Sequence, residues 1–243
     1  MVLPRRSPDW DALAPYWEHF EDGGLGQKAL AEIEPLVQTP LLYVGGGRGG
    51  LVAGLTRRFG RAAVHSVDRS TAMCRRAKQD HGVISLAADA AQLPFPDSGF
   101  ATVLCATGVV EYLDHNGRTR VLAELGRVCR PGGQVIAWAA CGDNGVHWET
   151  DQHALVRAWF AGRFDDRPAA VGAFNAVATA MGDRATAQAL LLAGLPQRGR
   201  AVSAAEVAAA AADAGIDVVE SHVDNDGIGR WHLTPTRSGR LAD

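Results

Sequence analysis

The chain has 243 residues, of which 47% are hydrophobic and 21% charged, and its formal net charge is −3. This balance shows no basic stripe and excludes a nucleic-acid-binding surface, and no apolar stretch is long enough to cross a membrane. Four scattered cysteines without CxxC or paired histidine spacing argue against a metal site and suit a reducing cytoplasm. The length allows one large α/β domain, or one domain with an inserted cap.

The N-terminal segment, residues 1–39, is expected to be a helical cap. It contains a Gly23-Gly24 break and a helical stretch from Gln27 to Val37. Its aromatic residues make it a candidate cover for a substrate pocket, and packing against the outside of the domain is the alternative. These aromatics are Trp10, Tyr16, Trp17 and Phe20.

From residue 40 onward, strand-like and helix-like segments alternate, which predicts a doubly wound, mostly parallel α/β sheet with right-handed crossovers. This core is expected to span residues 40–141. Pro131-Gly132-Gly133 is expected to end the third helix and lead into the fifth strand. The predicted strands are 40–44, 62–67, 83–88, 101–107 and 134–140, and the predicted helices are 50–59, 70–81 and 116–129.

Residues 142–202 interrupt this alternation with helix-like stretches around 150–161 and 171–193. They are expected either to cap a substrate pocket or to pack on the outer face of the sheet. The pattern resumes with Ser203 and Glu206, a capping-box pair that opens an alanine-rich helix ending at Gly215. Strands at 216–223 and 228–234, joined by a turn at 224–227, predict a terminal antiparallel hairpin, so that residues 203–243 complete the core.

The run from Leu41 to Gly50, LLYVGGGRGG, predicts a buried strand, a glycine turn and the start of a helix. Asp68 ends the next apolar run, where a carboxylate can accept both hydroxyls of a ribose. The site is therefore a nucleotide-cofactor site. The glycine spacing leaves two cofactors open, because Gly45, Gly47 and Gly50 fit a dinucleotide loop and Gly45, Gly47 and Gly49 fit an S-adenosylmethionine (SAM) loop.

Three later stretches favour the second cofactor. They are Asp89–Phe100 (DAAQLPFPDSGF), Val109–Leu113 (VVEYL) and Arg127–Gly133 (RVCRPGG). With the glycine turn, and with the terminal hairpin, the chain resembles class I SAM-dependent methyltransferases that act on small molecules. The resemblance implies a seven-stranded, Rossmann-like sheet, SAM as the cofactor and a methyltransferase activity.

The resemblance also implies roles for individual residues of the cofactor site. The turn of Gly45, Gly47 and Gly49 would meet the methionine part of SAM, and Asp68 would hold the ribose. The family normally has an acidic residue before the glycines, where this chain has Tyr43, which can hydrogen-bond but brings no charge. The remaining implied contacts are Asp89 and the Ala90 N–H at the adenine edge, Arg69 or Leu93 at the adenine face, and Thr107 and Gly108 near the sulfonium methyl group.

Methyl transfer needs alignment, exclusion of water and, for an acceptor that carries a proton, a general base. His147 is the preferred base, because it follows the fifth strand, and His19 is second. An apolar or aromatic small-molecule acceptor, methylated on oxygen or nitrogen, is expected, and the high alanine, glycine and arginine content suggests a bacterial source and natural-product tailoring. The residues expected to line the acceptor pocket are Trp17, Phe20, Glu111, His115 and Trp148.

Two alternatives stay open beside this hypothesis. Because Tyr43 replaces the usual acid, the chain could be a methyltransferase-fold protein that binds SAM or another ligand without methyl transfer, as a cyclase-like catalyst or a binding partner. The dinucleotide spacing of the glycines keeps a nicotinamide-dependent oxidoreductase open. The partners expected are a small-molecule acceptor and, at most, a second copy of the chain in a homodimer.

Overall fold

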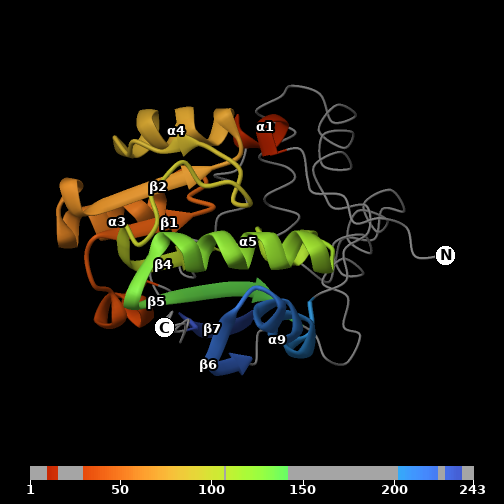
Figure 1. The fold of residues 1–243 in the computed structure, drawn as a ribbon. Helices are drawn as coiled ribbons and strands as arrows, with labels where there is room; N and C mark the ends of the chain where they lie inside the picture. Colours follow the sequence, from red (N-terminus) through yellow and green to blue (C-terminus); the bar gives the residue numbers. More distant parts are fainter. Residues whose placement is uncertain (1–9, 16–29, 107, 142–201, 224–227, 237–243) are drawn as a thin grey trace, which may run out of the picture.

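The computed structural model describes residues 10–15, 30–106, 108–141, 202–223 and 228–236. They form one seven-stranded sheet in the order β3-β2-β1-β4-β5-β7-β6, with helices on both faces (Figure 1). The first five strands along the chain pair in parallel, whereas β7 is antiparallel to both β5 and β6. The predicted doubly wound sheet with a terminal antiparallel hairpin is confirmed.

Two strands differ from their predicted bounds. β3 is shorter than predicted, because this edge strand pairs with β2 only at Leu86 and Ala87. β5 begins earlier than predicted, because Cys129 already pairs with Phe100, and a register shift then accommodates Pro131-Gly132-Gly133 inside the strand. The expectation that these residues precede the strand is therefore wrong. The strands are β1 Leu41–Val44, β2 Val64–Asp68, β3 Leu86–Ala87, β4 Phe100–Cys105, β5 Cys129–Ala140, β6 Ile216–Val223 and β7 Ile228–Pro235.

Three helices of the core begin at side-chain caps that the sequence provides, whereas the helix that begins at Gly50 has no side-chain cap. Ser70 and Asp114 each accept a backbone N–H of the first turn of the helix that follows, and Ser203 forms the predicted capping box with Glu206. The predicted helix-like stretches at 150–161 and 171–193 and the turn at 224–227 lie outside the described residues. The named helices are α1 Trp10–Leu13, α3 Gly50–Phe59, α4 Thr71–His81, α5 His115–Val128 and α9 Ala204–Asp213, with 3-10 turns at η2 Glu34–Leu36, η3 Arg61–Ala63 and η4 Val110–Tyr112.

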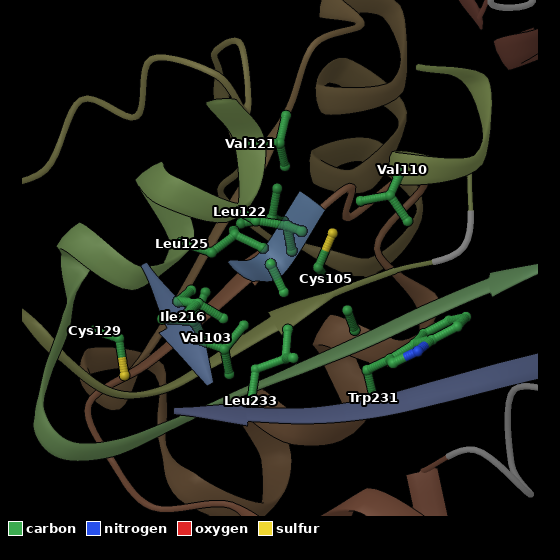
Figure 2. Close-up of a cluster of buried hydrophobic side chains, with 14 of the residues drawn as sticks. Val103, Cys105, Val110, Val121, Leu122, Leu125, Cys129, Ile216, Trp231 and Leu233 are labelled. Carbon is green, nitrogen blue, oxygen red and sulfur yellow. The ribbon is translucent and has the colours of Figure 1, made fainter. Parts of the chain in front are cut away.

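Alternating side chains of β1 divide the core into two clusters, one on each face of the sheet. Leu42 and Val44 belong to the cluster under α5 and α9, and Leu41 and Tyr43 to the cluster under α3 and α4. Figure 2 shows the first cluster, in which side chains of α5 meet side chains of the sheet, among them Ile216 of β6. Among the described helices, none has the length and apolar character needed to cross a membrane.

Arg127 of α5 fastens the loop between β3 and β4 to the core. Its guanidinium donates to the carbonyls of Leu93 and Phe95 at 3.0 and 2.8 Å and to the carboxylate of Asp97 at 2.7 Å. It also donates to Glu124, whose carboxylate accepts the Leu93 N–H at 2.8 Å. Hydrogen bonds that Arg127 donates to Glu124 and Asp97 raise its pKa, so the cation is held at all ordinary pH values.

We expect Arg127→Gln to lower the free energy of unfolding by about 1–3 kcal/mol, because a charged donor that satisfies two carbonyls is lost. Urea denaturation measures this change. Arg130→Gln is the matched control, since exposed Arg130 makes one 3.4 Å hydrogen bond to Gln38 in the described chain. Equal stability of the two variants would show that Arg127 does not hold this loop.

Candidate functional site

A cavity of about 240 Å³ lies at the carboxyl ends of the parallel strands. Its walls come from the glycine turn after β1, the ends of β2 and β3, the loop after β4 and the first half of α5. The strand order reverses between β1 and β4, and ligands of open α/β sheets bind at this switch point. The cavity is therefore where the fold predicts a ligand.

The glycine turn is held by the main chain of β2, and its residues Gly45 and Gly47 line the cavity. The N–H groups of Gly45 and Gly46 both donate to the Val67 carbonyl, at 2.9 and 3.0 Å. Gly47 has φ +52°, and a Cβ at this position would meet no atom within 4 Å. By contrast, a Cβ on Gly49 would lie 3.0 Å from that of Ala77, so Gly49 serves helix packing and does not line the cavity.

Asp68 ends β2 and lines the cavity next to this turn. One carboxylate oxygen accepts the Gly47 N–H and the other accepts the Ser70 N–H, both at 2.8 Å. Burial raises the pKa of Asp68, and these two hydrogen bonds oppose that rise. A carboxylate oxygen can accept more than one hydrogen bond, so Asp68 keeps capacity for two neighbouring hydroxyl groups of a ligand.

A second carboxylate reaches the same cavity from the end of β3. Asp89 accepts the Ala91 N–H at 2.9 Å through one oxygen, and its side chain is exposed. Ala90 lines the cavity beside it. The Ala88 N–H donates to the Asp68 carbonyl at 3.0 Å, which ties the two strand ends together. The structure thus brings both predicted aspartates to one cavity.

The loop after β4 forms another wall of the cavity, and a hydrogen bond to Glu111 holds this loop in place. Gly108, with φ +91°, and Tyr112 line the cavity. Glu111 is only 6% exposed and accepts the Gly108 N–H at 2.7 Å, without lining the cavity. His115 is exposed on the first turn of α5, and its imidazole contacts Asp213 of α9 at 2.7 Å. The structure therefore places neither Glu111 nor His115 in the lining of this cavity.

Tyr43 also lies away from the cavity, contrary to its expected role as a cofactor contact. The pleat of β1 turns Val44 to the cavity side and Tyr43 to the opposite face of the sheet, where it is 4% exposed. Burial raises the pKa of its hydroxyl.

Arg69 does line the cavity, as predicted, and its side chain is exposed. Six predicted residues lie outside the described part of the chain: Trp17, His19, Phe20, Thr107, His147 and Trp148.

Trp10 and Arg120 line the cavity, although the sequence assigned neither of them an individual role there. Trp10 packs its ring edge-on against Tyr112, with centroids 6.0 Å apart and an interplanar angle of 70°. Arg120 lines the cavity from α5. The aromatic run that begins at Trp10 was a usable signal for the first residue, whereas helical periodicity gives no signal for an exposed arginine such as Arg120.

The fold and the site together define the class of protein. Residues 41–133 match the family model described as a methyltransferase domain. This stretch contains the glycine turn, both aspartates and the loop after β4, and the sheet around it has the seven strands and the terminal antiparallel hairpin that the resemblance implies. The chain therefore contains a class I SAM-dependent methyltransferase domain.

Individual relatives agree with this class. The chain is 31% identical over 175 residues to malonyl-[acyl-carrier protein] O-methyltransferase of Halorhodospira halophila, which covers 61% of this chain and 57% of that protein. It is 32% identical over 118 residues to demethylmenaquinone methyltransferase of Deinococcus radiodurans, covering 46% and 48%. The chain spans about half the length of the curated relatives it matches.

A solved structure shows the same fold over nearly the whole chain. The CcbJ methyltransferase of Streptomyces caelestis is similar with a TM-score of 0.64 at 15% identity, covering 95% of this chain and 98% of that one. At this identity the likeness concerns the fold alone.

We expect Asp68→Ala and Asp89→Ala each to weaken binding of S-adenosylhomocysteine by about 1–3 kcal/mol, because each removes a hydrogen-bonding carboxylate from the cavity. Isothermal titration calorimetry measures the effect. Asp217→Ala is the control, since Asp217 is exposed on β6, remote from the cavity lining. Unchanged affinity in both cavity variants would mean that the two carboxylates do not hold this ligand.

Two glycine variants separate ligand binding from folding. Gly47→Ala places a methyl group into open space at the cavity, so it should weaken ligand binding and cost only about 1–2 kcal/mol of stability for its left-handed backbone. Gly46→Ala places a Cβ 2.2 Å from the Ser66 Oγ and should cost about 1–3 kcal/mol of stability by overpacking. Calorimetry and urea denaturation on both variants test this contrast, and identical behaviour would contradict it.

Proposed function

We propose that this chain transfers a methyl group from SAM to an oxygen or nitrogen atom of a small, apolar or aromatic acceptor. One observation carries the proposal. Asp68 and Asp89 line the same cavity, and so does Gly47 of the turn after β1, where a Cβ would meet no other atom within 4 Å. A cationic, hydroxyl-rich nucleoside fits such a set of carboxylates and bare main chain.

The cavity residues divide into contacts for the different parts of the cofactor. The turn at Gly45 and Gly47 would receive its methionine part, Asp68 the ribose hydroxyls, and Asp89 with the Ala90 N–H the adenine edge. Arg69, which lines the cavity, would lie on the adenine face. When bound, SAM supplies a methyl group activated by a positively charged sulfur.

The protein's own contribution is to align the acceptor, exclude water and accept a proton. His147 is the proposed base and His19 the second candidate. Trp17, Phe20 and Trp148 are proposed to line the acceptor pocket, and Thr107 to lie beside the methyl group.

The connection of residues 142–201 to the core supports this placement of the acceptor pocket. Cys141 and Val202 form a parallel bridge just beyond the carboxyl end of β5. The chain therefore leaves and re-enters the described core at the edge of the sheet that holds the cavity. Both curated relatives are named as methyltransferases, which supports the reaction, although their names give different acceptors.

A second candidate function is binding of SAM without methyl transfer. Tyr43 stands where the family normally has an acid, and its side chain is buried on the far face of the sheet. That position therefore contributes no carboxylate to the cavity, which is the observation in favour of this second function.

Calorimetry followed by turnover assays distinguishes these functions. We expect SAM and S-adenosylhomocysteine to bind, and mass spectrometry to show a gain of one CH₂ on a member of a panel of phenols, amines and carboxylates. Binding of both cofactors without product on any panel member would favour the second function. Absence of binding by either cofactor would contradict both.

A further inference from the structure

The short helix α1 is attached to the first turn of α4, and Asp11 makes the attachment (Figure 1). One oxygen of Asp11 accepts the Ser70 Oγ–H at 2.6 Å and the Ala72 N–H at 2.9 Å. Ser70 is itself the N-cap of α4 and accepts the Met73 N–H at 3.0 Å. Asp11 therefore adds a carboxylate cap to α4 beside the hydroxyl cap of Ser70, from 59 residues away in the sequence.

Ser70 also connects this cap with the carboxylate at the cavity. Its backbone N–H donates to Asp68 while its hydroxyl donates to Asp11. The hydrogen bonds thus run from Asp11 through Ser70 to Asp68, and from Asp68 to the Gly47 N–H of the glycine turn. Movement of α1 away from α4 would remove one partner of the residue that holds Asp68.

The neighbouring residue Trp10 places α1 over the cavity. Its indole contacts Tyr112, and a Cβ on Gly108 would lie 3.7 Å from it, so Trp10 reaches the loop after β4. The Pro15 carbonyl accepts a 3.4 Å hydrogen bond from Arg76 of α4, and Ala14 is fully buried. Through these contacts α1 bridges the two walls of the cavity.

We propose that Asp11 is a positioning residue. It couples the packing of α1, with Trp10, over the cavity to the binding of an adenosyl ligand by Asp68. This inference rests on the proposed function only in the identity of the ligand. Because Asp11 and Asp68 share Ser70, closure of α1 strengthens ligand binding. By thermodynamic reciprocity, bound ligand then stabilises closed α1 by the same factor.

The test measures ligand affinity and the protection of α1 in the same full-length variants. Calorimetry gives the affinity for S-adenosylhomocysteine, and hydrogen–deuterium exchange gives the protection of the peptide that covers residues 10–15. We expect Asp11→Ala to bind roughly fivefold more weakly than wild type and to lose the ligand-induced protection of α1. Asp11→Asn keeps one acceptor oxygen and should be intermediate, and Asp217→Ala should match wild type.

Three outcomes would overturn the inference. The first is an Asp11→Ala variant that binds S-adenosylhomocysteine as tightly as wild type although its α1 exchanges freely. This result would show that Asp11 fastens α1 but that the position of α1 does not affect ligand binding. Ligand-induced protection of α1 that persists in Asp11→Ala would show that Asp11 does not fasten the helix. A wild-type chain that binds no S-adenosylhomocysteine would overturn the proposed function and the coupling together, whereas the first two outcomes leave that function intact.

Discussion

The partly buried carboxylate of Asp68 is the constraint on which the site depends. A charge removed from water is costly unless it is hydrogen-bonded, and here two backbone N–H groups, from Gly47 and Ser70, compensate it. These two donors belong to the glycine turn and to the start of α4, so one side chain fixes the relative position of both segments. The same arrangement directs the remaining acceptor capacity of Asp68 into the cavity.

Contacts elsewhere in the fold hold the other cavity walls in place relative to this carboxylate. Arg127 and Glu124 bind the loop that follows Asp89, and the Gly108 N–H on Glu111 fixes the wall after β4. Two of the sequence stretches that carried the family resemblance, Asp89–Phe100 and Arg127–Gly133, are therefore one physical unit. The two stretches occur together because the guanidinium of Arg127 in the second donates hydrogen bonds to the carbonyls of Leu93 and Phe95 in the first.

The sequence predicted the features that local patterns encode, and missed those that depend on distant contacts. The strand–turn–helix at Gly45–Gly49 and the capping box at Ser203 were predicted, because spacing and capping act over a few residues. The side chain of Tyr43 was misplaced, because the pleat of a strand, and not its composition, decides which face a residue takes. Trp10 was expected only as one aromatic of a covering segment, because its individual place at the cavity depends on a contact made across the fold.

A crystal structure of the full chain with S-adenosylhomocysteine would show whether Asp68 holds the ribose. We expect the Asp68 carboxylate to accept hydrogen bonds from both ribose hydroxyls while it keeps the N–H groups of Gly47 and Ser70. A ligand bound elsewhere, or a ribose held by other groups while Asp68 points away from it, would rule out this role of Asp68.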